Sequence, residues 1–183
     1  LARLENDTLR NESDFEQASR TRSVLLYDPN DPQNTNLNVN VEFWKSPAAR
    51  AAGSVAGSYI DGVCTSGEVT VEMTDLGLVA TFPAGADYTF TVSGADAGAL
   101  AMTIYAYGSG DVEPVRTMDF NSLPAEDGSA CTVYIPEEPY DDFYIKDADG
   151  KEHYPDGGTP GDLNSDGRAD ILDVQFLYTY LIT

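Results

Sequence analysis

Basic residues are scarce in this sequence. Its 183 residues include 10 Lys and Arg against 31 Asp and Glu, which gives a formal net charge of −21 at pH 7. A surface of this sign repels phosphate backbones and anionic lipid headgroups while it keeps the chain soluble. Long hydrophobic runs are absent too, because no apolar stretch approaches the roughly 20 residues of a membrane-spanning helix. We therefore expect that the chain neither binds nucleic acid nor inserts into a membrane.

Groups that commonly carry catalysis are also sparse. The only histidine, His153, lies in the polar segment 151–155, so neither a histidine cluster for zinc nor a Ser-His-Asp triad is indicated. There is no G-x-S-x-G elbow and no G-x-x-x-x-G-K-[ST] phosphate loop. With 31 acidic residues, no particular pair of glycosidase carboxylates stands out. We predict that the chain is not an enzyme, and that any hydrolase domain of the parent protein lies upstream of Leu1.

Cysteine occurs only twice, and no signal peptide opens the chain. Because the sequence starts at Leu1 without a methionine, we expect a processed fragment whose export signal lies upstream. In an exported protein two cysteines favour a disulfide. A Cys64–Cys131 bridge would close a long loop and add about 4 kcal/mol by the chain-entropy model. The alternative is two separate buried thiols. The distance between the two Cα atoms determines whether a disulfide can form.

The acidic residues form one ordered pattern near the carboxyl end, where residues 162–173 read DLNSDGRADILD. In the twelve-residue EF-hand-like calcium loop, side-chain oxygens come from positions 1, 3, 5, 9 and 12, a carbonyl comes from position 7, and glycine at position 6 makes the turn. Gly167 fills the turn position. The sequence therefore predicts a Ca²⁺ site with these ligands: Asp162, Asn164, Asp166, the Arg168 carbonyl, Asp170 and Asp173.

Calcium is expected to act as a folding ligand for this loop. The four aspartates would repel one another at such short range, so the loop should close only around a hard cation. An earlier stretch, 147–150, begins a similar pattern but has no carboxylate at the closing position. We predict that this earlier stretch is a simple turn.

Two features distinguish the loop from a helix-loop-helix calcium sensor. Pro160 and Gly161 stand where the entering helix should end, and neither residue supports a helix. The loop closes with an aspartate, and the following helix carries Val174, Leu177 and Leu181 on one face. The stretch 161–167, with Asp170, Asp173 and Tyr180-Leu181, closely resembles one repeat of a type I dockerin.

Dockerins are small calcium-dependent modules that attach secreted bacterial proteins to cohesin modules on scaffolding proteins, as in cellulosomes. The resemblance covers residues 161–183 and implies Ca²⁺, a cohesin or scaffold partner, and a secreted or cell-surface location. A typical dockerin has two such repeats, whereas this chain contains one. In the family, the tenth and eleventh loop positions and a basic pair in the exit helix carry partner recognition. Here they are Ile171-Leu172 and Tyr178-Thr179, which could face an unusual cohesin or pack on the preceding domain.

Upstream of the repeat, the apolar residues follow the period of two that is typical of half-buried strands. Gly-, Pro- and Asp-containing turns separate these segments at roughly ten-residue spacing, which predicts an antiparallel β-sandwich of about 7–9 strands. The fold class is thus mostly β, with a small C-terminal calcium loop and helix. The expected strands centre on 37–43, 69–73, 88–92, 100–104, 118–120, 131–135 and 143–145.

The sandwich also resembles, faintly, the Ig-like or X-module-like accessory modules of secreted clostridial-type bacterial proteins. The residues that carry this resemblance are 86–98, 102–104 and 116–120. We divide the chain into four parts: a linker or short helix over 1–21, the sandwich over 22–154, a linker over 155–160 and the dockerin-like repeat over 161–183.

Two functions follow from these patterns. The first is a non-catalytic calcium-binding module that assembles its parent protein on a cohesin-bearing scaffold. The alternative is a carbohydrate-binding accessory sandwich of a secreted hydrolase, with a purely structural calcium loop. Trp44, Tyr105 and Tyr107 fall on the outward phase of their strands, where rings could stack on a polysaccharide. The same rings could instead fill the second sheet face or lie under the terminal helix.

Overall fold

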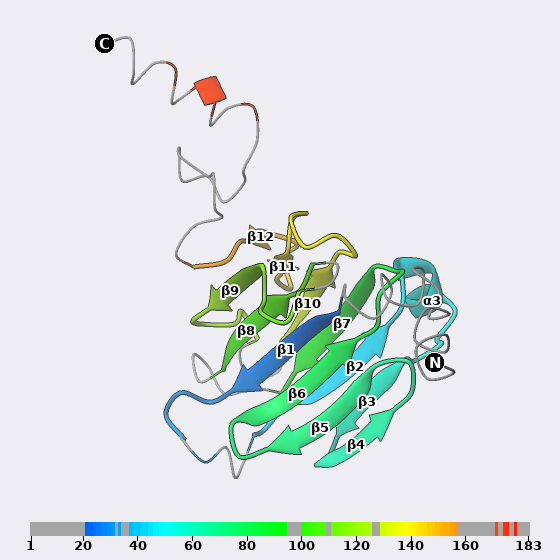
Figure 1. The fold of residues 1–183 in the computed structure, drawn as a ribbon. Helices are drawn as coiled ribbons and strands as arrows, with labels where there is room; N and C mark the ends of the chain where they lie inside the picture. The colour runs from blue at the N-terminus through cyan, green and yellow to red at the C-terminus, as the bar shows by residue number, and fades with distance from the viewer. Residues whose placement is uncertain are drawn as a thin grey trace, which may run out of the picture.

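The computed structural model describes residues 21–31, 33, 37–94, 100–108, 111–125 and 129–156, and also 171, 174, 175 and 178. Within these residues the chain forms twelve strands in two antiparallel sheets (Figure 1). The prediction of a mostly β protein with two antiparallel sheets is confirmed. The predicted calcium loop and its helix lie almost wholly outside the described residues. None of the described helical segments is long and apolar enough to cross a lipid bilayer.

The first sheet, called sheet A, has the strand order β5-β6-β1-β8-β9. Its strands are β1 (Arg22–Tyr27), β5 (Thr70–Thr74), β6 (Gly77–Phe82), β8 (Ala101–Ala106) and β9 (Arg116–Phe120). The second, sheet B, has the order β12-β11-β10-β7-β2-β3-β4. Its strands are β2 (Asn40–Trp44), β3 (Gly57–Ile60), β4 (Val63–Ser66), β7 (Tyr88–Ser93), β10 (Ala130–Ile135), β11 (Tyr144–Lys146) and β12 (Glu152–His153).

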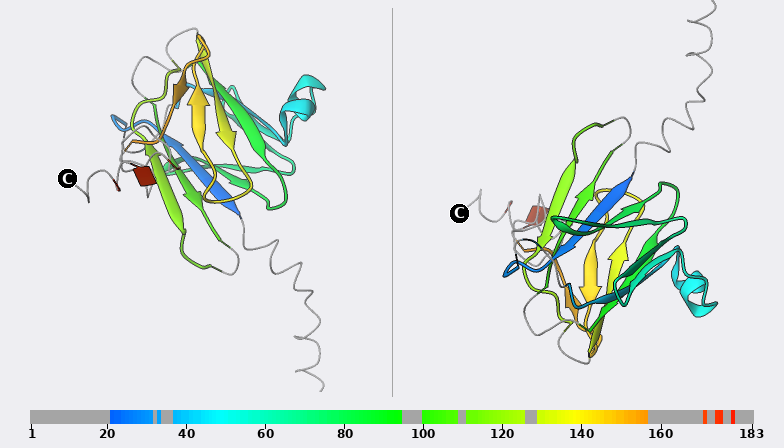
Figure 2. Two further views of the ribbon diagram at one scale, coloured as in Figure 1. Left: turned by 90° about the horizontal axis from the view of Figure 1, so that it is seen from above. Right: turned by 90° about the horizontal axis from the view of Figure 1, so that it is seen from below.

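The two sheets face each other across a core of alternating inward side chains (Figure 2). In β10, for example, Cys131, Val133 and Ile135 are buried while the residues between them are half-buried. Aromatic rings from both sheets meet in the core, where the Phe43 centroid lies 5.7 Å from Phe82 and 5.1 Å from Phe90. Burying such rings is a large part of what holds a sandwich together.

All seven expected strand segments overlap strands, although residues 37–39 of the first segment precede β2. The predicted count of 7–9 is wrong, because the described residues form twelve strands. The strands missed are β1, β3, β4, β6 and β12. In β1 the outward Leu25 and Tyr27 are also apolar or aromatic, which hides the alternation. The β3–β4 hairpin had a local signal, since Asp61 and Gly62 have φ of 49° and 80°, the left-handed pair that an Asp-Gly hairpin turn uses.

The predicted Cys64–Cys131 disulfide is wrong, since both cysteines are free. Cys131 is on β10 and Cys64 on β4, four steps away in the order of sheet B. At about 4.8 Å per step the two strands are about 19 Å apart along the sheet, and a disulfide needs Cα atoms within about 7 Å. Burial raises the pKa of the Cys131 thiol to about 12, so it is an inert core group.

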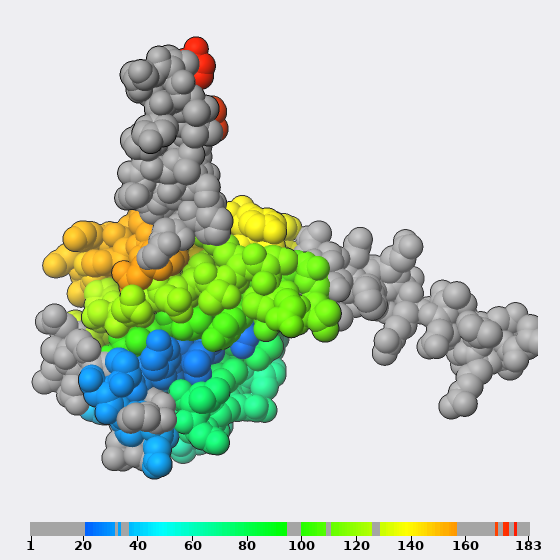
Figure 3. Space-filling model, turned by 60° about the vertical axis from the view of Figure 1, so that its left-hand side comes forward, coloured from blue at the N-terminus to red at the C-terminus, as the bar shows by residue number. Residues whose placement is uncertain are grey.

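One short helix, α3 (Pro47–Ala51), interrupts the path from β2 to β3 and projects outside the two layers (Figure 2). Ser46 caps it, because the Ser46 Oγ accepts a hydrogen bond from the Ala49 N–H at 3.1 Å, and Pro47 occupies the first turn. At the other end of the described region, Asp156 bridges to Asp119 of β9. Contacts with sheet A therefore continue two residues into the predicted linker 155–160. Figure 3 shows this arrangement, with residues 144–156 (orange) lying beside residues 100–125 (green).

Candidate ligand-binding face

The predicted calcium site cannot be placed geometrically, because all its ligands lie outside the described residues: Asp162, Asn164, Asp166, Arg168, Asp170 and Asp173. Among the residues that the structure does describe, no group of three or more His, Cys, Asp or Glu could hold a metal ion. The stretch 147–150 forms the predicted turn, in which the Asp147 carbonyl accepts the Gly150 N–H at 3.0 Å and Gly150 has φ of 81°.

The three aromatic residues singled out in the sequence do not come together. Trp44 lies on the outer face of sheet B but is only 7% exposed, and the Arg50 guanidinium of α3 sits 5.1 Å from its ring centroid. Tyr105 is half-buried on the outer face of sheet A, and Tyr107 follows the end of the same strand. The predicted set of rings therefore does not form a single sugar platform.

A different set of rings does form a continuous surface, on the outer face of sheet B. Tyr134 of β10 and Tyr144 of β11 are cross-strand partners, with centroids 4.5 Å apart and ring planes 11° from parallel. Tyr154, just after β12, continues the row at 6.1 Å from Tyr144. We call Tyr134, Tyr144 and Tyr154 the tyrosine row. Stacked, half-buried rings of this kind are fixed contact surfaces with little conformational entropy left to lose.

Charged groups flank the tyrosine row on one side. The Lys146 ammonium lies 5.5 Å from the Tyr134 centroid and 5.6 Å from the Tyr144 centroid, and it pairs with Glu152 at 3.5 Å. The hydroxyl of Tyr154 donates to the same Glu152 carboxylate at 2.8 Å. These contacts connect β10, β11 and β12 on one face of the sheet.

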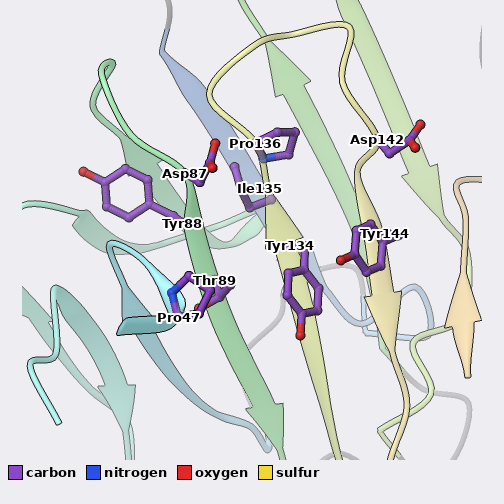
Figure 4. Close-up of a pocket in the computed structure, with 9 residues that line it drawn as sticks. All are labelled: Pro47, Asp87, Tyr88, Thr89, Tyr134, Ile135, Pro136, Asp142 and Tyr144. Atoms are coloured by element: carbon purple, nitrogen blue, oxygen red, sulfur yellow. The ribbon is translucent and has the colours of Figure 1, made fainter. Parts of the chain in front are cut away.

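A pocket of about 180 Å³ opens beside Tyr134 (Figure 4). Pro47 of α3 and Thr89 of β7 line one side, and the Tyr134 ring lies on the other. Asp87, Pro136 and Asp142 lie toward its rim. Tyr88, Ile135 and Tyr144 complete the lining, which thus combines three tyrosines, two prolines, an isoleucine, a threonine and two exposed carboxylates. This mixture suits a small polar ligand with an apolar face.

Two buried arginines hold the loops that form this rim. Arg22 and Arg116 belong to sheet A and face inward at one end of the sandwich, in one row with Ala106 between them. Arg22 donates to the Ala86 carbonyl at 2.6 Å, next to Asp87. Arg116 donates to the Asp141 carbonyl at 2.9 Å, next to Asp142. The pocket on sheet B is therefore shaped by residues of sheet A.

Burial lowers the pKa of both guanidinium groups, while the neighbouring acidic residues act in the opposite direction. The acidic neighbours of Arg22 include Asp87 and Glu137, and Asp142 is the acidic neighbour of Arg116. Arginine stays charged even when it is buried, so each rim loop folds around a fixed cation.

Some buried polar atoms on this face have no hydrogen-bond partner within the described part of the chain. They are the Thr89 and Thr91 hydroxyls of β7 and the Trp44 indole nitrogen of β2. Thr89 is 3% exposed and stands directly opposite both Trp44 and Tyr134 in the sheet. A buried hydroxyl without a partner costs about 1–3 kcal/mol, so its retention needs an explanation.

No protein-family model, no curated protein and no solved structure matches this chain. The stacked phenol rings, hydroxyls and small pocket of this face offer non-covalent contacts to a ring-shaped, hydroxyl-rich ligand.

The tyrosine row and the two arginines were missed in the sequence. A signal existed for the row, because Tyr134 and Tyr144 alternate with the inward residues Val133, Ile135, Phe143 and Ile145. No comparable signal existed for Arg22 and Arg116, since charged residues are almost never expected in a core.

Proposed function

We propose that this chain is a non-catalytic accessory module of a secreted bacterial protein, in which a dockerin-like repeat at 161–183 binds Ca²⁺ and tethers the parent protein to a cohesin-bearing scaffold. The preceding sandwich acts as an Ig-like accessory domain. The observation that carries this proposal is the complete set of oxygen ligands and the turn glycine at 162–173.

The described positions of the C-terminal helix support a partner-facing surface. Ile171, Val174 and Tyr178 are helical and are 67%, 58% and 65% exposed. Two of them, Ile171 and Tyr178, occupy positions that carry partner recognition in dockerins. Large exposed apolar side chains are typical of surfaces that contact a partner.

A cohesin pull-down with the full chain tests this proposal. We expect stoichiometric capture in calcium, loss of capture with a chelator, and loss for Asp162→Ala. Asp149→Ala, in the exposed turn before β12, is the matched control and should bind as the parent chain does. Ile171→Lys should keep calcium binding but lose capture. Capture that ignores both the chelator and Asp162→Ala would contradict the proposal.

Calcium binding can be measured separately by calorimetry. We expect Ca²⁺ to raise the melting temperature of the C-terminal segment, because it binds only the folded loop. Mg²⁺ should act weakly, since it demands a tighter octahedral shell and gives up its water reluctantly. The site would be contradicted if Ca²⁺ and Mg²⁺ raised the melting temperature equally. It would also be contradicted if Ca²⁺ raised the melting temperature of Asp162→Ala as much as that of the parent chain.

The tyrosine row favours a second function, which is carbohydrate binding by the sandwich. Phenol rings fixed on a sheet provide apolar surfaces for the C–H faces of sugars, while nearby hydroxyls and charges bind sugar hydroxyls. A glycan array followed by titration tests it. Tyr134→Ala should weaken binding about tenfold or more, as for a central aromatic contact, whereas Tyr105→Ala on sheet A should not. Equal losses for the two variants would place binding elsewhere.

A further inference from the structure

We propose that the pocket bounded by Pro47, Thr89 and Tyr134 is a subsite for one neutral sugar ring, in which the Thr89 hydroxyl is the hydrogen-bond partner of a sugar hydroxyl. This inference rests on the carbohydrate-binding function proposed above and narrows it to a ligand class and a binding mode. It concerns the sandwich alone and does not depend on calcium.

The stacking geometry limits binding to a single ring. Tyr134 and Tyr144 lie 4.5 Å apart and nearly parallel, so each covers one face of the other. Lys146 occupies a further side of both rings. The ring surface of Tyr134 that remains for a ligand is the part that borders the pocket. A sugar can therefore stack there, but a long chain cannot stack along the whole row.

The size of the pocket agrees with that limit. About 180 Å³ is below the range of roughly 300–1,000 Å³ that is common for pockets of drug-sized ligands. One six-membered ring suits such a space, whereas a disaccharide would have to extend out of it.

The unpartnered hydroxyl identifies the polar contact. Thr89 lines the pocket and is 3% exposed, and its Oγ1 has no partner among the described residues. Protein hydroxyls that are buried without a partner are uncommon, because they lose their hydrogen bonds to water and gain none in return. Because the Oγ1 has almost no accessible surface of its own, a ligand hydroxyl reaches it only when the Pro47 or Tyr134 side chain shifts aside, and it would then supply the missing partner.

The charges around the pocket select a neutral ligand. The lining includes two carboxylates, Asp87 and Asp142, and no cationic side chain. The nearby guanidiniums of Arg22 and Arg116 are buried behind the rim and donate to the Ala86 and Asp141 carbonyls, so they do not line the pocket. Nearby, Lys146 is paired with Glu152, and Arg50 donates to the Thr132 hydroxyl at 3.1 Å. With a formal net charge of −21 in addition, a uronic acid or a sulfated sugar would be repelled.

The sheet provides a matched pair of variants. Thr89 and Thr91 are on the same strand and the same face, and the hydroxyls of both lack a partner among the described residues. Only Thr89 lines the pocket. Replacing either threonine with valine removes a buried unpartnered hydroxyl and keeps the shape, so both variants should melt at or slightly above the parent temperature. Only Thr89→Val should weaken ligand binding.

The experiment is an NMR titration of the full chain with methyl glycosides of neutral hexoses, the matching uronic acid, and oligomers of the hexose that binds best. We expect the neutral glycoside to bind with shifts at Thr89 and Tyr134, and the uronic acid to bind at least tenfold more weakly. Oligomers should gain no more than about threefold. Thr89→Val should weaken binding at least fivefold, and Thr91→Val should not.

The outcomes separate this inference from the proposed function. If Tyr134→Ala abolishes binding but Thr89→Val behaves as Thr91→Val does, the sandwich binds sugar and the pocket subsite is wrong. A gain of a hundredfold or more with chain length, or equal binding of the uronic acid, would also overturn the subsite. If no neutral sugar shifts any resonance of this face, both the subsite and the carbohydrate-binding function fail.

Discussion

The outer faces of sheet A and sheet B both carry aromatic rings, but they arrange them differently. On sheet A, Tyr27 and Tyr105 line a groove of about 450 Å³ together with Leu25 and Leu76, and Leu76 is 68% exposed. On sheet B the rings of the tyrosine row touch one another and are flanked by the Lys146–Glu152 pair.

Strand register explains this difference. Tyr134 is paired directly with Tyr144, so their side chains leave the sheet at neighbouring points. On sheet A, Tyr27 is opposite Ala101, and Tyr105 is opposite Ser23 and Thr117. Similar numbers of rings therefore give a groove on one sheet and a stacked row on the other. The comparison teaches that aromatic content alone does not identify a binding face.

The largest effect is expected where the two sheets depend on each other. Arg116→Met removes a buried cation of sheet A that holds the rim loop of sheet B, through its bond to the Asp141 carbonyl. We expect a loss of about 1.5–3 kcal/mol in the free energy of unfolding, the range for hydrogen bonds to charged groups. Urea unfolding measures it. Arg50→Met, which changes an exposed arginine, should cost about 1 kcal/mol or less. Equal costs would mean that sheet A does not hold the rim.

A double-mutant cycle compares the two faces directly. Tyr134→Ala and Tyr144→Ala should show a coupling of about 0.5–1.5 kcal/mol, because each ring stacks on the other. The same cycle with Tyr27→Ala and Tyr105→Ala on sheet A should give a coupling near zero, since these two are not cross-strand partners. Denaturation of all six variants and the parent chain provides both coupling energies. Similar coupling energies on the two sheets would show that the rings of sheet B do not interact more strongly than those of sheet A.

The charged edge of the tyrosine row should contribute less. Lys146→Met removes the ammonium beside two rings and the pair with Glu152, whose side chains are 38% and 37% exposed. Because solvent screens this pair, we expect a loss of about 0.5–1 kcal/mol, part of which disappears at high salt. Unfolding at two ionic strengths tests it. A loss independent of salt would assign the effect to packing of the lysine stem.

The smallest effect concerns pH and lies at the edge of sheet B. A hydrogen bond from His153, 2.7 Å away, lowers the pKa of Asp147, with further help from the Lys151 and Asp149 N–H groups. A carboxyl with a lowered folded pKa stabilises the protein above its unfolded pKa of about 3.9, and this stability is lost as the pH falls through the folded value. Asp147→Asn, which keeps an acceptor for the turn, should therefore flatten stability between about pH 5 and pH 2. Identical pH profiles would show that the contact does not affect stability.

Much of the sandwich could be predicted from alternation. In segment 88–92 the apolar and aromatic residues all lie on one face, and in 131–135 Tyr134 is the one exception. Both segments are strands that begin and end within two residues of the expected bounds. Strand β1 could not be found in this way, because Leu25 and Tyr27 lie over the groove on the outer face and break the alternation. A strand with apolar residues on both faces can be recognised only when the residues that surround its outer face are known.

The candidate binding face was less predictable. The alternation of residues along β2 correctly predicted that Trp44 lies on the outer face of the sheet. Its ring is nevertheless covered by Arg50 of the following helix. Tyr134 and Tyr144 were each readable as outward residues, but their stacking depends on a pairing between strands separated by the loop 136–143. Thr89 could not be singled out from its neighbours, since nothing local shows that Pro47 and Tyr134 enclose it.

The amino-acid sequence by itself determined the two-sided character of seven strands and the spacing of oxygen ligands at 162–173, because both are periodic patterns along the chain. Tertiary structure alone decided three other properties. It separated Cys64 from Cys131, buried Arg22 and Arg116 between the sheets, and aligned Tyr134 with Tyr144. The physical reason is that strand order and register, which no local period encodes, fix which distant side chains meet.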